Sequence, residues 1–201
     1  MHNELASTGD FSSASLIKNA DFTEQVGMEG RFEAKCYDKD GNLKWEETID
    51  NLVMAVGKQL MLDTLLAGSS YTATVVMGLV SGASSPTYAA ADTQSSHAGW
   101  LESGAANAPT YSGTRKTPAF SSATSSGSTP TNVTTKTTSS AVSFTFTGSG
   151  TVAGCFININ GSSTIDNTTG TLYSAGSFTG GNKTVASTDV LNVTYSTTAT
   201  S

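Results

Sequence analysis

Three stretches in the last third of the chain decide the fold class: Gly150-Thr-Val-Ala-Gly-Cys-Phe-Ile-Asn-Ile-Asn160, Gly170-Thr-Leu-Tyr-Ser-Ala-Gly-Ser-Phe178 and Asp189-Val-Leu-Asn-Val-Thr-Tyr195. Small, β-branched and hydroxylated side chains dominate them, and glycine-rich turns separate them. Such residues fit the pleated surface of a β-sheet. The stretches carry almost no group that could do chemistry, which is typical of a scaffold rather than of a site of turnover.

The composition agrees with extended β-structure. Serine and threonine make up about 30% of the 201 residues, and charged residues 13%, roughly half of the usual quarter. The low charge separates this chain from solvated disorder, which needs high net charge. The net charge of −6 argues against nucleic acid as a partner, because such a surface is basic. No apolar run of about 18 residues occurs, so we expect no membrane partner either.

Strands are predicted in the rest of the chain as well. Residues 31–49 are predicted to form a hairpin, because apolar and charged residues alternate over 31–36 and again over 43–46, the period-2 pattern of half-buried strands. Asp40-Gly41 between them predicts a two-residue type I′ turn. Further strands are predicted at 74–80, at two or three places in 115–147, and at 151–159, 171–178 and 189–197. This spacing is typical of a β-sandwich, a jelly roll or a barrel.

One α-helix is predicted at about 51–67. Apolar residues recur there at a spacing of three to four, Asp50 or Asn51 can cap the start, and Gly68 ends the helix. Its apolar surface is wide enough to pack against the sheet and against a second subunit. Of these two, we favour packing in the core of the chain itself.

The first 30 residues follow no sustained period. Their apolar residues, among them Phe11, Leu16, Ile17 and Phe22, are scattered among polar ones. We interpret residues 1–30 as an extended N-terminal arm whose apolar residues contact a partner, or else as a frayed terminus. Residues 31–201 then form the β-domain. The start also lacks the basic and apolar segments of a secretory signal, so we expect no signal-directed export.

A long connection is predicted at 83–114, and such loops are usually functional or bound to a partner. It carries Tyr88, His97, Trp100 and Tyr111, which are candidate contacts for a partner or a carbohydrate. The alternative is a small core under the loop, in which His97 and Trp100 anchor the loop against the sheet. We favour this alternative for Trp100.

The sequence gives little support to catalysis. Serines and Asp92 lie near His97, but with so many hydroxyl residues this proximity carries little information, and no Gly-x-Ser-x-Gly elbow accompanies it. Cys36 and Cys155 are far apart and lack Cys-x-x-Cys spacing. We expect two buried thiols, with a disulfide as the alternative. Neither a clustered metal-ligand set nor a cofactor motif is found, so no catalytic residue, metal or cofactor is expected.

The order of the motifs carries a resemblance. The hairpin Asp40-Gly-Asn-Leu-Lys-Trp-Glu46 leads into the apolar segment 51–66, and Val75-Val-Met-Gly-Leu79 follows. Then come Ser96-His-Ala-Gly-Trp-Leu-Glu102 and Gly150-Thr-Val-Ala-Gly154. Over about residues 31–197 this order resembles a family of small virion proteins of tailed bacteriophages, usually encoded among the head genes.

The resemblance implies a capsid decoration or cement protein, or another head-associated structural protein, with no catalytic residue to assign. We therefore expect a dimer or trimer on the capsid exterior, assembled in the host cytoplasm, that stabilises the capsid through noncovalent contacts with the major capsid protein. The alternative is a head fibre or tail-associated adhesin that binds host surface glycans through the 83–114 loop. A hydrolase that uses His97 is a third, weaker hypothesis.

Overall fold

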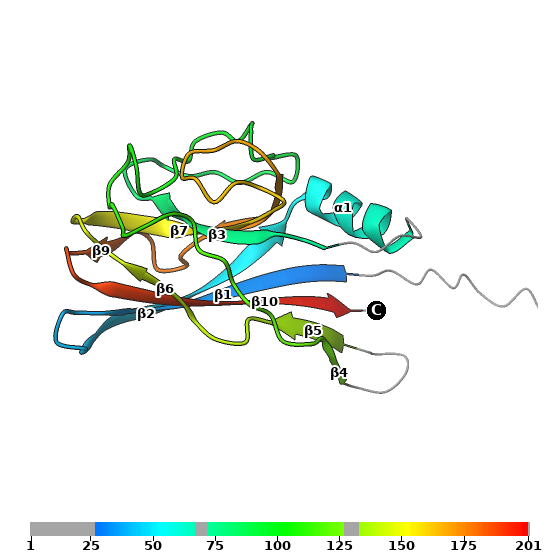
Figure 1. The fold of residues 1–201 in the computed structure, drawn as a ribbon, viewed down its shortest axis with the longest axis horizontal. Coiled ribbons are helices and arrows are strands. Elements are labelled where there is room, and N and C mark those ends of the chain that lie inside the picture. The colour runs from blue at the N-terminus through cyan, green and yellow to red at the C-terminus, as the bar shows by residue number, and fades with distance from the viewer. Residues whose placement is uncertain (1–26, 67–71, 127–132, 201) are drawn as a thin grey trace, which may run out of the picture.

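The structure is a computed structural model that describes residues 27–66, 72–126 and 133–200. These residues form ten antiparallel strands and one helix, so the predicted all-β fold with a single helix is confirmed (Figure 1). In chain order the elements are β1 (Gly27–Tyr37), β2 (Leu43–Val53), α1 (Ala55–Leu66), β3 (Val75–Ser81), β4 (Thr124–Ser126), β5 (Val133–Thr137), β6 (Val142–Thr145), β7 (Gly150–Ile159), β8 (Thr171–Ser177), β9 (Lys183–Val185) and β10 (Val190–Thr200).

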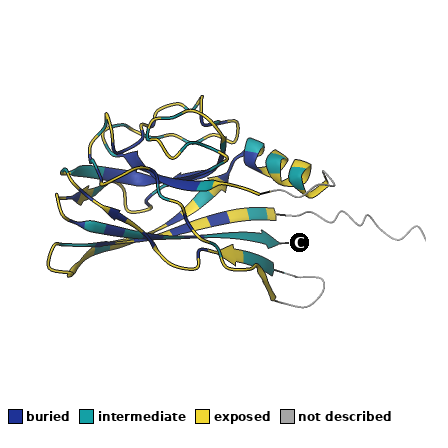
Figure 2. Ribbon diagram, in the orientation of Figure 1, coloured by how far each residue is buried: buried dark blue, intermediate teal, exposed yellow. Residues whose placement is uncertain are grey.

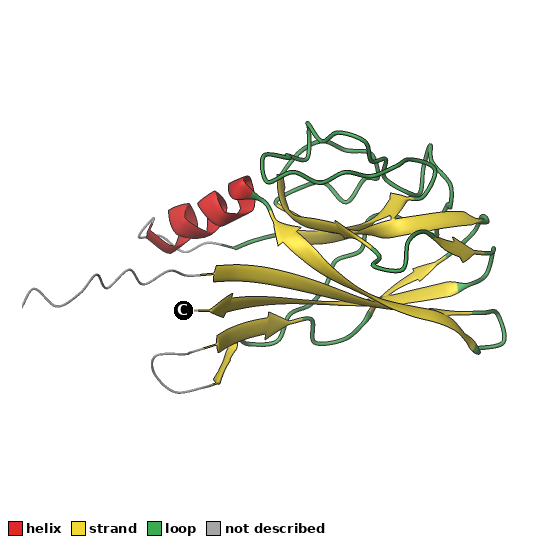
Figure 3. Ribbon diagram, turned by 180° about the vertical axis from the view of Figure 1, so that it is seen from behind, coloured by secondary structure: helices red, strands yellow, loops and turns green. Residues whose placement is uncertain are grey.

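The strands form one open sheet that folds into two facing layers. Its order is β3-β7-β8-β2-β1-β10-β5-β4, with β6 paired to β10 and β9 paired to β7. Strand β2 joins the layers, because it pairs with β1 over most of its length while Leu52 and Val53 pair with β8. Seen from behind, β2 crosses from one layer to the other (Figure 3). Of the arrangements predicted, the structure therefore has the sandwich-like one.

Two cores lie on the two sides of the layer that contains β3, β7 and β8. The larger core fills the space between the layers, where Phe32 of β1, Ile157 of β7 and Tyr195 of β10 pack together. The smaller core lies between the outer face of β7 and β8 and the loops above them, and it includes Trp100 and Phe156. The strands of this layer are accordingly buried along most of their length (Figure 2).

The burial on both faces explains the composition of β7. Val152, Cys155 and Ile157 belong to the larger core, whereas Ala153 and Phe156 belong to the smaller one. A strand covered on both faces reads as a continuous apolar run rather than as an alternation. Strand β7, the first of the three stretches that decide the fold class, thus lies between the two cores.

The β1–β2 hairpin is confirmed, but its turn is not the predicted two-residue type. Residues 38–42 form the connection, and within it Gly41 has a positive φ of 83° whereas Asp40 does not have a positive φ. The Asp38 carboxylate accepts hydrogen bonds from the backbone N–H groups of Asp40 and Asn42, at 2.9 and 2.8 Å. The side-chain amide of Asn42, which also donates to this carboxylate, lowers the pKa of Asp38 most, and the two backbone bonds lower it further. An aspartate-centred loop replaces the type I′ turn because Asp38 satisfies the backbone donors locally.

The predicted start of the helix is wrong. Residues 51–53 belong to β2, and α1 begins at Ala55. Leu52 and Val53 fit the helical spacing, but they pair with Ala175 and Ser174 of β8, more than a hundred residues away. Neither Asp50 nor Asn51 caps the helix, because both lie in the strand. Residues 27–30 of the predicted arm likewise lie in β1, where they pair with β10.

The remaining strand predictions are confirmed, and so is the long connection predicted at 83–114, which lies between β3 and β4. The strands predicted around 74–80, 142–147, 151–159, 171–178 and 189–197 are present, whereas the short β9 is an element that the sequence did not predict. Cys36 and Cys155 are buried free thiols, as predicted. In the described part of the chain, no helix has the length and apolarity that a membrane crossing requires.

Candidate functional site

The long loop between β3 and β4 forms a cover over the outer face of the β7–β8 layer (Figure 1). We call residues 82–115 the loop cover. Three of its predicted contact residues meet above β7: the His97 ring stacks on Trp100 with centroids 3.8 Å apart, and Tyr88 lies 6.3 Å from Trp100. Trp100 packs in turn on Phe156 of β7 at 5.3 Å. The predicted anchoring of the loop by His97 and Trp100 is confirmed.

The burial of these rings limits what they can contact. Trp100 is only 3% exposed and Tyr111 only 5%. Tyr111 lies away from the other three, in the larger core, edge-on to Phe144 at 5.1 Å. The prediction that Trp100 and Tyr111 are exposed contacts for a partner is therefore corrected. Both side chains are buried and stabilise the fold. Tyr88 and His97 are half-buried. The arm residues Phe11, Leu16, Ile17 and Phe22 lie outside the described residues.

A buried ion pair that the sequence analysis did not predict ties the loop cover together. Arg115 donates from Nε to Glu102 Oε1 at 2.8 Å and from Nη2 to Oε2 at 2.6 Å, a bidentate pair with side chains 0% and 5% exposed. Arg115 also donates to the carbonyl oxygens of Ser162 and Asn167 in the β7–β8 loop, at 3.0 and 2.7 Å. Glu102 Oε2 accepts from the backbone N–H of Asp166 at 2.8 Å. The pair thus joins two loops that are distant in sequence.

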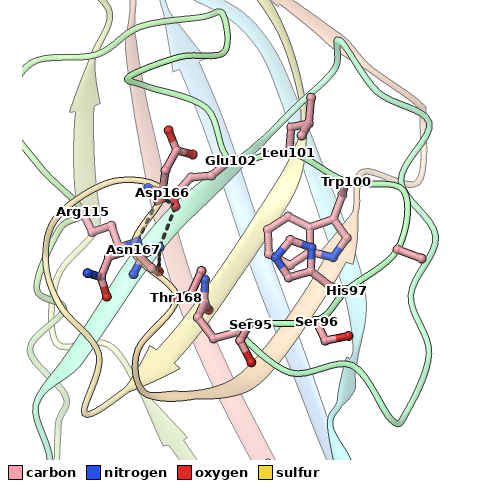
Figure 4. A pocket seen from close by; sticks show the side chains of 12 residues that line it. Ser95, Ser96, His97, Trp100, Leu101, Glu102, Arg115, Asp166, Asn167 and Thr168 are labelled. Carbon is pink, nitrogen blue, oxygen red and sulfur yellow. Dashed lines mark hydrogen bonds and ion pairs between the residues drawn. The ribbon is translucent and has the colours of Figure 1, made fainter.

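A cavity of about 520 Å³ opens between these two loops (Figure 4). On one side stand His97 and Trp100, and on the other stand Asn167 and Thr168. Burial lowers the pKa of His97, against the opposing effect of Asp92. No hydrogen bond joins the His97 side chain to a serine or a carboxylate within the described ranges, which gives the Ser-His-Asp hypothesis no geometric support. Within those ranges, no three His, Cys, Asp or Glu side chains are grouped to hold a metal ion.

Helix α1 presents the most exposed apolar surface among the described residues. Leu62, Leu65 and Leu66 are 61%, 78% and 81% exposed. The prediction that the apolar face packs in the chain's own core is therefore wrong for most of the helix. Gly57 is the buried residue of α1, and a Cβ there would lie 2.9 Å from Cδ2 of Tyr173 in β8. Only one side of α1 contacts β8, and the helix projects beyond the end of the layer (Figure 1).

An apolar groove of about 330 Å³ lies beside α1 at the same end of the sandwich. It takes side chains from both layers and from the helix, among them Met28 of β1, Met61 of α1, Val75 of β3, Ile157 of β7 and Ala199 of β10. The Tyr173 hydroxyl, which also lines it, donates to Sδ of Met61 at 3.5 Å. Met61 therefore connects the groove to the exposed leucines. We call Leu62, Leu65 and Leu66 the leucine ridge of α1.

Comparisons with protein-family models, with curated proteins and with solved structures found no match. The function is accordingly argued from the surface features of this chain and from the order of its motifs.

Proposed function

We propose that this chain is a virion structural protein that decorates and stabilises a bacteriophage capsid through noncovalent contacts with the major capsid protein. The observation that carries the proposal is the leucine ridge. Contiguous exposed apolar surface on a folded domain usually marks a contact with another protein. The motif order described above supports a virion protein in particular, and the proposed assembly on the capsid exterior is a dimer or trimer.

The rest of the molecule suits a passive structural role. The two cores and the Glu102–Arg115 pair hold a rigid β-scaffold, from which α1 projects at one end. A symmetric shell offers the same contact many times. Modest interfaces repeated on one assembly then give strong attachment through high effective concentration. Such a protein needs a stable scaffold and one exposed apolar contact rather than a deep ligand site.

Attachment to capsids tests the proposal. Replacing Leu62 and Leu65 together by serine should reduce co-sedimentation of the full chain with capsids that lack it, by about tenfold or more, since each buried leucine contributes roughly 1.5–3 kcal/mol. Asp63→Ser changes an exposed residue of the same helix and is the matched control. Attachment that is equal in the double variant and the control would remove the ridge as the contact.

The cavity at the loop cover favours a second function, a head fibre or tail-associated adhesin that binds host glycans. Its volume of about 520 Å³ lies within the range of small-molecule sites, and its walls combine hydroxyl and amide side chains with the His97 ring. Trp100→Ala is a poor test because the ring is buried. Thr168→Val removes a hydroxyl from the lining at an exposed residue, so it should abolish signals on a glycan array if this function holds. Thr184→Val, at an exposed site in β9 away from the cavity, is the control.

Copy number separates the two functions at little cost. A decoration protein covers the shell in many copies, whereas an adhesin at a tail or fibre is present in a few. Quantitative mass spectrometry of purified virions against the major capsid protein measures the ratio. A ratio near one copy per capsid subunit or capsomer supports decoration, and a handful of copies per particle supports the adhesin.

A further inference from the structure

The apolar groove between the layers lacks an occupant among the described residues. Its lining is apolar from both layers, from Met28, Val75 and Ile157 to Ala199, with Phe120 on the strand-like segment before β4. Apolar surface of this kind gains roughly 25 cal/mol for each Å² removed from water. A volume of about 330 Å³ is several times the roughly 30 Å³ that one water molecule occupies. The groove can therefore accept large side chains.

The chain itself supplies a segment at the mouth of this groove. Met28, which lines the groove, stands in the second position of β1, and residues 1–26 precede that strand. Phe22 is six residues before Met28, so an extended chain lets it reach up to ~20 Å from there. The pair Leu16-Ile17 is eleven and twelve residues away, within ~40 Å. The groove therefore lies within the reach of both.

The charges of the segment and of the groove are complementary. Within residues 1–26, Glu4, Asp10, Asp21 and Glu24 oppose a single Lys18. The groove is lined by one charged side chain among the described residues, Lys136 of β5, whose Nζ donates to the carbonyl of Ser121 at 2.9 Å. Asp21 and Glu24 flank Phe22 in sequence. A Phe22 ring in the groove would bring these carboxylates toward the ammonium group, a contact of modest strength at a surface.

We propose that the N-terminal segment of this chain, through Phe22 and the pair Leu16-Ile17, binds in the apolar groove of the same molecule. Attachment in the same molecule is favoured because a linker of six residues gives a high effective concentration, whereas a second copy must be recruited from solution. The assignment does not depend on the capsid role, which rests on the leucine ridge.

Cysteine cross-linking in the full chain tests the assignment directly. Phe22→Cys is combined with Ala123→Cys at the rim of the groove. The native thiols do not compete, because burial raises the pKa of Cys36 to about 12 and also raises that of Cys155, and a protonated buried thiol is unreactive. The matched control combines Phe22→Cys with Asp40→Cys in the β1–β2 connection, at the opposite end of the molecule (Figure 1).

The expected result is an intrachain disulfide that forms about tenfold faster or more in the Ala123 pair than in the Asp40 pair, read by non-reducing electrophoresis and peptide mapping. Adding Lys136→Glu should slow this cross-link at low salt and leave it less changed at high salt. Equal rates in the two pairs overturn the proposal. Interchain dimers in place of the intrachain product also overturn it, since the groove would then hold the segment of a second copy. Neither outcome alters the capsid attachment expected from the leucine ridge.

Discussion

The loop cover and helix α1 both lie outside the two layers of strands, yet their large side chains differ in burial. The loop cover has little regular structure, but its aromatic rings stack on β7 and its one arginine is paired with Glu102 and two carbonyl oxygens. Helix α1 is regular, but it leaves three leucines exposed. Irregular backbone and the most exposed apolar side chains therefore do not coincide in this protein, because the leucines with the greatest exposure lie on the regular helix. It is there that we propose the contact with a partner.

The largest effect on stability is expected from removing the arginine of the loop cover. Arg115→Ala leaves the Glu102 carboxylate buried without its partner, and such a loss costs roughly 3–5 kcal/mol. The unfolding midpoint in urea should fall accordingly. Arg31→Ala removes an exposed pair with Asp50, whose side chains are 53% and 76% exposed, and should leave the midpoint unchanged. If both variants unfold alike, the loop cover is not held by its buried pair.

The strands of the sandwich can be predicted from the sequence better than the Glu102–Arg115 ion pair can. Alternation over 31–36 and small, β-branched and hydroxylated side chains over 151–159 are local patterns, and they predicted β1 and β7 correctly. Pairing of Leu52 and Val53 with β8 depends on a partner more than a hundred residues away, so the local spacing placed them in the helix. A weak signal for the Glu102–Arg115 pair did exist: residues 64–201 hold eight charged groups, and Arg115 is the only arginine among them. Scarce charges in an apolar segment tend to be paired when buried.

The exposure of the leucine ridge could not be predicted from the sequence either, because it also depends on which distant residues cover the helix. The apolar spacing of 52–66 indicates a face that needs covering, but it does not say whether the cover is the sheet or another molecule. The structure covers Gly57 with Tyr173 and leaves the later turns beyond the end of the layer. The same limit applies to the groove, which is formed by residues from six strands, α1 and the segment before β4 and has no local signature.

A smaller effect is expected from an ion pair at the surface of the sandwich. Glu47 of β2 pairs with Lys183 of β9 and accepts from the backbone N–H of Gly180 at 3.2 Å. The lysine, the larger cause, and this hydrogen bond lower the pKa of Glu47 below its usual 4.5. The carboxylate therefore stabilises the fold above pH 4.5, and that contribution is lost as the pH falls through the lowered pKa.

Glu47→Gln should then cost about 1 kcal/mol at neutral pH, and the difference from the native chain should shrink as the pH falls from about 6 to about 3. Thermal unfolding across that range measures it. Glu33→Gln, on the exposed face of β1, should leave the shape of the stability profile unchanged. A difference that stays constant with pH would mean that Glu47 acts through packing rather than through its charge.

The smallest effect on folding is expected at the leucine ridge, where the expected effect on attachment is largest. Leu65→Ser with Leu66→Ser removes two side chains that are already in water, so the free energy of unfolding should change by less than about 0.5 kcal/mol per site. Leu172→Ala, at a fully buried leucine of β8, should cost roughly 2–5 kcal/mol under the same conditions. Urea unfolding of the three chains checks both values. A large loss from the ridge variant would mean that α1 is covered within its own molecule, and the leucines would then need no partner.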